Sequence, residues 1–199
     1  MTLIVKHLKI GLFPGDPVPP QDPENRGNVG RYLEEVLRSQ GLTVNPTGID
    51  VPDLKMELKT RKNDAVAAFS ICRMSVTDIL TTDFEDSRLY QSIENLLLVK
   101  YNDILNVVTS VNVYNWANDP IILAAFKYAY NSAKLIFSQG TSVYTKKTVV
   151  RGNNSFGYFE IDRGSSQNDI YEFRISKNNL KKLEITNKQV KFKELFEIK

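Results

Sequence analysis

The spacing of apolar residues changes several times along the chain, between the period of a helix and that of a strand. Apolar residues recur at helical spacing from 29 to 37 and again from 121 to 137, while the other segments carry the short apolar or alternating runs typical of strands. This order of helix, strands, helix and further strands predicts an α/β or α+β fold with a mixed central β-sheet flanked by helices. The 199 residues have 42% hydrophobic content, enough for one substantial core, so we expect a single domain over 1–199.

End signals delimit the two helices. Asn28 is a suitable cap for the first helix, and Gly41 is expected at the C′ position that ends it. The pair Asp119 and Pro120 is a strong start signal for the second helix, which should end at Gly140. Strands are expected at 1–13, at 42–44, within 48–61, at 65–74, at 95–101 and 105–114 as a hairpin, and as short runs between 143 and 175.

Composition limits the setting in which the protein works. The single cysteine, Cys72, lies in an apolar run, which predicts a buried thiol, excludes a disulfide framework and fits a reducing, intracellular setting. The N-terminal stretch 1–13 is interrupted by charged residues, which is typical of a strand rather than of a signal peptide. No apolar run approaches the length needed to cross a membrane. We therefore expect a soluble, cytoplasmic protein without a membrane partner.

The rarity of histidine and cysteine excludes several kinds of active site. His7 is the only histidine and Cys72 the only cysteine, so zinc sites, Ser-His-Asp triads and histidine-metal nucleases lack their components. The sequence contains neither a phosphate-binding P-loop nor a GxGxxG motif. Carboxylates, lysines and a hard cation such as Mg²⁺ remain as the means of catalysis.

The stretch GIDVPDLKMELKTR, residues 48–61, combines acids and bases on an alternating strand. Alternation places Glu57 and Lys59 on the same face, about 6.6 Å apart along the strand at ~3.3 Å per residue. An acid and a base at that separation can flank one phosphate. The E-x-K triplet alone is weak support, because the C-terminal residues 197–199 repeat it and solvated strand faces often carry such charges.

A chain reversal would bring a second carboxylate to this strand. If the strand ran straight from Asp53 to Glu57, the two carboxylates would be ~13 Å apart, too far to share one ion. Pro52 followed by Asp53 signals a turn, so Asp50 is expected opposite Glu57, with Asp53 at the bend as the alternative ligand. We expect Asp50, Glu57 and the backbone carbonyl of Leu58 to bind Mg²⁺.

Together with an upstream helix, these residues resemble a known family. The segment GNVGRYLE at 27–34, followed by Asp50 and by ELKT at 57–60, is similar to the MutH-type endonucleases, which belong to the PD-(D/E)xK nuclease superfamily. In that family a helix opening with G-x-x-G carries a glutamate, and an aspartate stands seven residues before the glutamate of the E-x-K triplet. The resemblance covers about residues 27–72 and implies catalytic roles for Glu34, Asp50, Glu57 and Lys59.

The resemblance implies a PD-(D/E)xK restriction-endonuclease-like fold and an Mg²⁺-dependent, sequence-specific endonuclease. Such an enzyme cuts double-stranded DNA and leaves 5′-phosphate and 3′-hydroxyl ends. We prefer a type II restriction enzyme, because a small domain with its own basic region needs no accessory module. A mismatch-repair nickase, a structure-specific nuclease and a DNA-binding protein without catalysis are the alternatives. Two choices stay open: monomer or homodimer, and Glu34 or Glu35 as the helix carboxylate.

Charge is distributed unevenly along the chain. Residues 141–199 contain 12 Lys/Arg and 7 Asp/Glu, whereas residues 1–140 contain 14 and 16. The C-terminal third is therefore expected to contact DNA, beside a catalytic core at about 27–115, although a solvated lysine-rich surface would have the same composition. The residues that suit phosphate and base contacts are Arg61, Lys62, Tyr144, Lys146, Lys147, Arg151, Asn153, Asn154 and Ser155.

Overall fold

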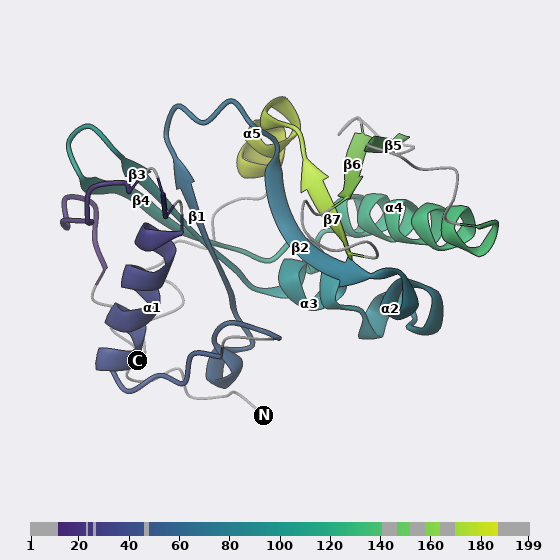
Figure 1. The fold of residues 1–199 in the computed structure, drawn as a ribbon, viewed down its shortest axis with the longest axis horizontal. Coiled ribbons are helices and arrows are strands. Elements are labelled where there is room, and N and C mark those ends of the chain that lie inside the picture. The colour runs from purple at the N-terminus through teal and green to yellow at the C-terminus, as the bar shows by residue number, and fades with distance from the viewer. Residues whose placement is uncertain are drawn as a thin grey trace. The chain divides into compact units, whose positions relative to one another are not determined.

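The structure is a computed structural model, and its helices and strands form two compact units (Figure 1). Unit 1 contains the described residues of Met1–Ala65 and Asn95–Tyr114, and unit 2 those of Val66–Glu94 and Asn115–Asn187. Each unit has a β-sheet of its own. The residues described are 12–22, 24–25, 27–45, 48–140, 147–151, 158–163 and 170–186, with backbone alone for 147–151, 158–163 and 185–186.

Unit 1 is built on a mixed three-stranded sheet with the strand order β1-β3-β4. The strands are β1 at Glu57–Lys62, β3 at Leu96–Asn102 and β4 at Val107–Tyr114. β1 runs parallel to β3, and β3 runs antiparallel to β4 as the hairpin that the sequence predicts. The expected mixed sheet flanked by a helix is therefore confirmed for unit 1.

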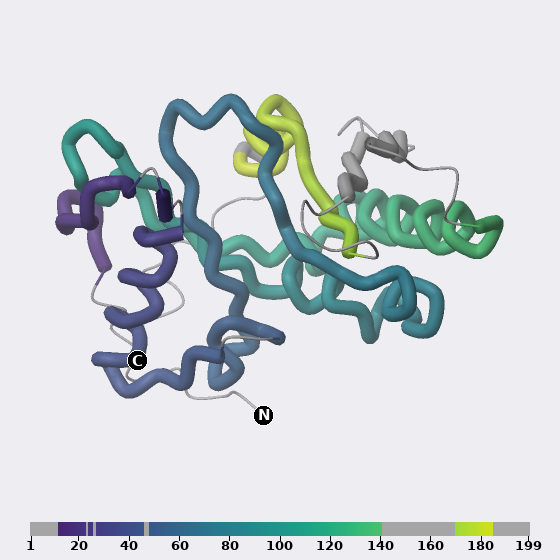
Figure 2. Tube along the Cα trace, viewed as in Figure 1, coloured from purple at the N-terminus to yellow at the C-terminus, as the bar shows by residue number. Residues whose placement is uncertain are grey.

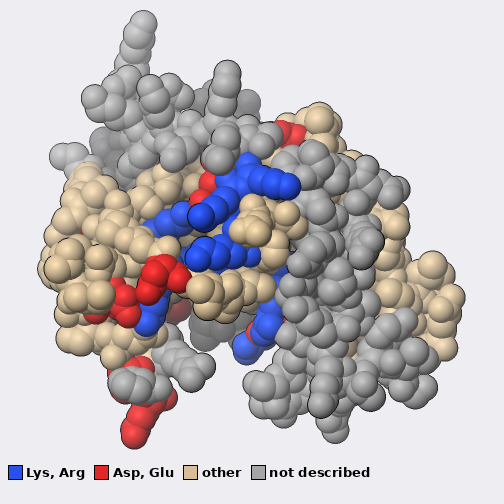
Figure 3. Space-filling view, turned by 90° about the horizontal axis from the view of Figure 1, so that it is seen from above, with Lys and Arg blue, Asp and Glu red and all other residues tan. Residues whose placement is uncertain are grey.

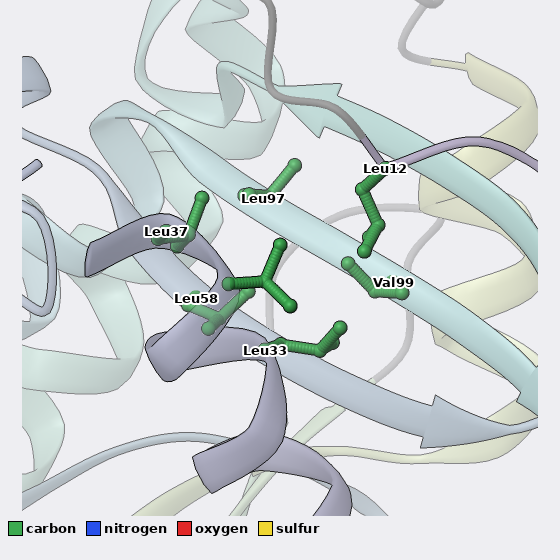
Figure 4. A pocket seen from close by; sticks show the side chains of 7 residues that line it. Leu12, Leu33, Leu37, Leu58, Leu97 and Val99 are labelled. Atoms are coloured by element: carbon green, nitrogen blue, oxygen red, sulfur yellow. The ribbon is translucent and has the colours of Figure 1, made fainter. Parts of the chain in front are cut away.

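Helix α1 (Asn28–Ser39) packs its apolar face against one face of this sheet. Leu33 and Leu37 of α1 belong to one buried cluster with Leu58 of β1 and with Leu97 and Val99 of β3. Figure 4 shows these side chains converging from the helix and the strands around a cavity of about 10 Å³. The cavity has an apolar lining and barely the volume of one water molecule, so it is a packing gap rather than a ligand site.

The ends of α1 agree with prediction, with one correction. Gly27 is the N-cap and Asn28 is the first helical residue; the Asn28 side chain donates through Nδ2 to the carbonyl of Pro20 at 2.6 Å and accepts through Oδ1 from the Val29 amide at 2.9 Å. Gly41 has φ +84° directly after the C-cap residue Gln40, as expected for a C′ glycine.

Residues 42–44 do not form the predicted strand. Leu42 and Val44 are buried and Thr43 is exposed, so the alternation in the sequence reflects a true alternation of burial. The backbone is not in a ladder, however, because the Thr43 amide donates to a side-chain oxygen of Asp53 at 2.8 Å. The Asp53 carboxylate thus accepts the hydrogen bond that the carbonyl of a neighbouring strand would accept in a sheet.

Unit 2 is built on an antiparallel four-stranded sheet with the strand order β2-β7-β6-β5. Its strands are β2 (Phe69–Ser75), β5 (Lys147–Arg151), β6 (Tyr158–Arg163) and β7 (Ile170–Ile175). β2 follows β1 along the chain but pairs with β7. The described part of the chain therefore has two sheets where the sequence predicts one central sheet.

The helices of unit 2 are α2 (Val76–Thr81), α3 (Arg88–Glu94), α4 (Pro120–Ser138) and α5 (Lys177–Thr186). Short 3₁₀ turns cover Phe84–Asp86 and Trp116–Asn118, and a third, at Pro52–Leu54, belongs to unit 1. The start of α4 is as predicted, because an Asp119 side-chain oxygen accepts hydrogen bonds from two amides of the first turn. Its end is marked by Gly140 at φ +109°.

The core of unit 2 is rich in aromatic side chains. Trp116 and Tyr130 are fully buried, and Tyr130 stacks on Phe173 of β7. The Tyr130 hydroxyl donates to the carbonyl of Thr82 at 3.0 Å, and burial raises the pKa of this phenol to about 12. Cys72 is buried and forms no disulfide, as predicted.

Three predictions concern the N-terminal segment or the chain as a whole. The N-terminal strand at 1–13 lies almost entirely outside the described residues, and so does the chain after 186. Among the helices that the structure describes, none is long and apolar enough to cross a bilayer. The single domain over 1–199 stays a prediction.

Candidate functional site

A tight turn precedes β1 and reverses the chain, as the sequence predicts. Val51 and Met56 form an isolated antiparallel bridge, in which each amide donates to the other residue's carbonyl at 2.9 and 3.0 Å. Between them lie the 3₁₀ turn Pro52–Leu54 and Lys55, which adopts the left-handed conformation at φ +49°. Figure 2 traces this path from α1 through the turn into β1. The residue before the bridge, Asp50, is thereby returned to the start of β1.

The turn sends its two aspartates in different directions. Asp50 Oδ2 accepts a hydrogen bond from the Leu58 amide at 2.8 Å, so this carboxylate lies against β1. Asp53, at the bend, accepts from the Thr43 amide and is exposed. The Leu58 amide nitrogen is bonded to the carbonyl carbon of Glu57, so Asp50 Oδ2 lies within about 5 Å of the Glu57 Cα atom. Of the two candidates, Asp50 is the one that meets the E-x-K strand.

Glu57 and Lys59 point the same way and form an ion pair. The Lys59 Nζ atom lies 2.5 Å from Glu57 Oε1. Glu57 is 1% exposed, whereas the Lys59 side chain keeps 26% of its surface accessible. Burying a carboxylate is unfavourable unless a partner compensates for lost hydration, and Lys59 supplies that compensation. Leu58, between them, faces α1, so the pair lies on the opposite face of the sheet.

Leu58 also presents backbone groups to Asp50. The amide and carbonyl of one strand residue point to the same edge of the strand. The Glu57 amide donates to the carbonyl of Asn95 at 2.9 Å, on the side of β3. The amide and carbonyl of Leu58 therefore face the other edge, where the amide binds Asp50. The Leu58 carbonyl oxygen shares that edge with the Asp50 carboxylate.

The donor set at this edge suits a hard cation. Asp50 and Glu57 bring two negative charges and Lys59 one positive charge, so the group carries a net charge of about −1 when all three are ionised. Within the part of the chain that the structure describes, no three or more His, Cys, Asp or Glu side chains gather as a ready-made metal cage. Mg²⁺ does not need one, since it is usually held by one or two carboxylates and keeps several waters.

Glu34 forms its ion pair with a residue of its own helix and not with this group. Its carboxylate pairs with Arg38 one turn later on α1 at 3.2 Å, and the Glu34 side chain is 30% exposed. Glu35 is exposed on the same helix. The helix approaches β1 at Gly30, where an added Cβ would lie 3.9 Å from Thr60 Oγ1. That is ordinary van der Waals distance, so the approach would tolerate alanine.

The two basic residues at the end of β1 differ in their surroundings. Lys62 Nζ lies 2.6 Å from Asp103 Oδ2; this hydrogen bond raises the pKa of Lys62 and lowers that of Asp103. Arg61 donates to the carbonyl of Ala65 at 3.2 Å. By alternation Arg61 shares the face of Glu57 and Lys59, whereas Lys62 does not.

A further basic residue on this face was not among the sequence candidates. Lys100 of β3 lies directly beside Arg61 in the parallel register, and Leu98 lies beside Lys59. Lys59, Arg61 and Lys100 therefore share one face of the sheet. Lys100 is the one charged residue of the run LLLVKYN at 96–102, a signal that the sequence contained. Figure 3 shows lysine and arginine side chains gathered on one face of the molecule.

The remaining DNA-binding candidates belong to the C-terminal third. Lys147 and Arg151 are the two ends of β5, where the backbone pairs them with Asp162 and Tyr158 of β6. Their side chains are not described. The other five, Tyr144, Lys146, Asn153, Asn154 and Ser155, lie outside the described residues.

The sequence matches no model of a known protein family, and no curated protein matches it significantly. The function must therefore be inferred from the residues themselves. The structure brings together Asp50, Glu57, Leu58 and Lys59, and it leaves Glu34 with Arg38.

Proposed function

We propose that this chain is an Mg²⁺-dependent DNA endonuclease of the PD-(D/E)xK type, with a type II restriction enzyme as the preferred class. One observation carries the proposal: the turn at Val51–Met56 holds Asp50 against the Leu58 amide, beside the buried Glu57 and its partner Lys59. The mixed sheet covered by α1 is compatible with that superfamily's fold. Such an enzyme would meet its double-stranded DNA in the cytoplasm.

Each residue of the group has a role in this proposal. The carboxylates of Asp50 and Glu57 and the carbonyl of Leu58 would hold Mg²⁺, and the Leu58 amide fixes the orientation of Asp50. When bound, Mg²⁺ supplies Lewis-acid polarisation of the phosphate and lowers the pKa of a coordinated water. Lys59 places its ammonium group beside the reacting phosphate, where it orients the water and stabilises the developing negative charge.

The proposal balances as a hydrolysis. Water attacks the phosphorus atom, the bond from phosphorus to the 3′ oxygen breaks, and the leaving oxygen takes up a proton. The products are a 5′-phosphate and a 3′-hydroxyl end. Arg61 and Lys100, on the same face as Lys59, would contact neighbouring phosphates and contribute affinity that weakens with salt.

A cleavage assay with Lys59→Ala tests the proposal. We expect the wild-type chain to cut plasmid DNA with Mg²⁺ and to stop when EDTA is added. Because Lys59 acts on the chemical step more than on affinity, Lys59→Ala should bind cognate DNA and cut it at least ~10²-fold more slowly. Lys127→Ala, which removes an exposed lysine paired with Glu85 in unit 2, is the matched control and should cut normally.

The products of the assay separate the alternatives. Discrete double-strand cuts with one end sequence support a restriction enzyme, and single-strand nicks support a mismatch-repair nickase. Near-normal cleavage by Lys59→Ala would overturn the site. Sequence-specific binding without cleavage, whichever divalent ion is supplied, would replace the enzyme by a DNA-binding protein on the same fold.

A further inference from the structure

The outward face of α4 differs from that of a solvated helix. A surface helix normally carries charged or polar residues on the side away from the core. On α4 the exposed large hydrophobic residues are Ile121, Tyr128 and Leu135, with 59%, 41% and 61% of their surface accessible, and Lys127 is exposed beside them. They are spaced seven residues apart, so they form one straight stripe along the helix.

Small residues complete this stripe. Ala124, Asn131 and Ser138 are exposed and follow each large residue by three positions. The six positions are therefore the a and d positions of a heptad pattern, with large residues at a and small residues at d. The Ser138 hydroxyl donates to the Leu135 carbonyl at 2.7 Å, so its polar group is satisfied within the helix. We name these six residues the α4 stripe.

We propose that the α4 stripe is the interface of a homodimer, in which α4 packs antiparallel against α4 of a second copy. An antiparallel pair centred between Ala129 and Tyr130 sets each position opposite its mirror position. Each large residue then faces a small one: Ile121 opposite Ser138, Tyr128 opposite Asn131, and Leu135 opposite Ala124. The pattern is self-complementary, which a two-fold axis requires of a symmetric interface.

Other occupants fit the pattern less well. In a parallel pair Ile121 would face Ile121, and Ala124 would face Ala124, so bulky layers would alternate with gaps. The antiparallel pair keeps the helices evenly spaced. Lys127 and Lys134 are both g positions, and g positions flank each other in an antiparallel pair, so Lys127 of one copy would lie near Lys134 of the other. Lys127 and Lys134 already have partners in their own chain, Glu85 and Asp83.

The length of the α4 stripe limits the surface that two copies can bury, and therefore the affinity of the dimer. A helix of 19 residues is about 28 Å long at 1.5 Å per residue. One helix pair of that length lies at the low end of specific interfaces. The dimer should therefore exchange with monomer, and its population should rise with protein concentration in the micromolar range. This inference does not depend on the proposed nuclease function, because the stripe lies in unit 2.

Sedimentation equilibrium of the full chain tests the dimer through a size swap. Ala124→Leu puts leucine opposite Leu135 of the second copy, and Leu135→Ala leaves alanine opposite Ala124. We expect each change to weaken dimerisation at least ~10-fold. The double variant Ala124→Leu/Leu135→Ala restores one large and one small residue at each layer, so it should dimerise within about threefold of wild type. Alanine and leucine both favour helix, so folding should be kept, and circular dichroism checks this.

Three results would overturn the proposal. One is a wild-type chain that stays monomeric up to ~1 mM, since weaker association is negligible. Another is tighter association by Ala124→Leu, which would indicate a parallel pair. The third is a double variant that is as weak as the single variants, because only mutual contact between positions 124 and 135 predicts rescue.

Discussion

Among the side chains that the structure describes, each unit buries one strand glutamate that stands two residues before a basic residue, but the partners differ. In unit 1, Glu57 pairs with Lys59. In unit 2, Glu172 of β7 pairs with Arg174 and also with Arg73 of the neighbouring strand β2. Both glutamates are nearly inaccessible. These two buried pairs therefore have the same spacing of acid and base in two different electrostatic settings.

The difference shows that the third charge decides what such a pair can do. Burial works to raise the pKa of Glu172, but the hydrogen bonds from Arg73 and Arg174 outweigh it, and the pKa is lowered. Two guanidinium groups on one carboxylate leave no demand for a further cation. Near Glu57 the third charge is the carboxylate of Asp50, held on the Leu58 amide. Two acids and one base attract a cation, so only the unit 1 pair suits a metal-dependent reaction.

The largest expected effect comes from exchanging the two glutamates for glutamine. Glu57→Gln removes a proposed metal ligand, so DNA cleavage should fall at least ~10³-fold, at the upper part of the range for losing a positioned catalytic group. Glu172→Gln should leave the cleavage rate unchanged at temperatures where the variant is folded. It should instead lower the free energy of unfolding by about 1–2 kcal/mol, the scale of a charged hydrogen bond.

Rate measurements and urea unfolding on both variants give the comparison. If Glu172→Gln abolished cleavage while remaining folded, the two pairs would not be separate in function. If Glu57→Gln kept its cleavage rate, the unit 1 pair would be as structural as the unit 2 pair.

Glu34 allows a smaller test of how far the unit 1 site extends. If it belongs to the site as the family resemblance implies, Glu34→Ala should lower cleavage at least ~10²-fold, while Glu35→Ala leaves it nearly unchanged. The lost ion pair with Arg38 is exposed and worth less than about 0.5 kcal/mol, so unfolding would not explain a loss of rate. Single-turnover cleavage rates decide the matter. The opposite order would assign the helix carboxylate to Glu35, and no effect from either would confine the site to the turn and β1.

The effect of Mg²⁺ on the melting temperature should distinguish the Glu57 pair from the Glu172 pair. Mg²⁺ at ten times its dissociation constant stabilises a folded protein by about 1.4 kcal/mol, which for a chain of this size is about 3–6 °C. We expect this rise in wild type and in Glu172→Gln, and little of it in Glu57→Gln. Thermal melts with Mg²⁺ and with EDTA measure the three shifts. Equal shifts in all three proteins would place the ion elsewhere.

The smallest expected effect is a pH dependence of stability that belongs to unit 2. The Glu172 pKa is lower in the folded than in the unfolded state, so the unfolded state binds the proton more readily. Its contribution to stability is thus present above the ordinary value of 4.5 and is lost as the pH falls through the lowered pKa. In urea unfolding from pH 7 to pH 3, the stability difference between wild type and Glu172→Gln should shrink below pH ~4.5. A constant difference would show that the arginines do not hold Glu172 ionised.

Local sequence signals predicted the helix ends well. They did not predict which strands pair with each other across long stretches of sequence. Asp119 and Gly140 mark the ends of α4, and Gly41 ends α1, because caps act within one helical turn. The pairing of β2 with β7 joins residues about a hundred positions apart, and nothing in either strand specifies its partner. For the same reason the division into two sheets was not foreseen.

The candidate site was predictable to the extent that it is local. Asp50 was inferred from the turn signal at Pro52, and the shared face of Glu57 and Lys59 from strand alternation; the structure has both features. The surroundings of Glu34 were not predictable, since an exposed carboxylate on a helix pairs with whichever base lies one turn away. Lys100 was missed because its position beside Arg61 depends on the parallel register of β1 and β3.

The bridge between Val51 and Met56 holds Asp50 near Glu57. The distance between these two residues therefore depends on the number of residues inside the bridge more than on which residues they are. The four residues inside the bridge close one specific turn, and Lys55 already occupies the left-handed conformation that asparagine or glycine would adopt more readily. Apart from Asp53, which binds the Thr43 amide, these residues should therefore accept many substitutions, whereas an insertion or deletion of a single residue would rotate Asp50 away from the Leu58 amide. Distant relatives of this chain should be sought by an aspartate seven positions before an E-x-K triplet, with the intervening letters ignored.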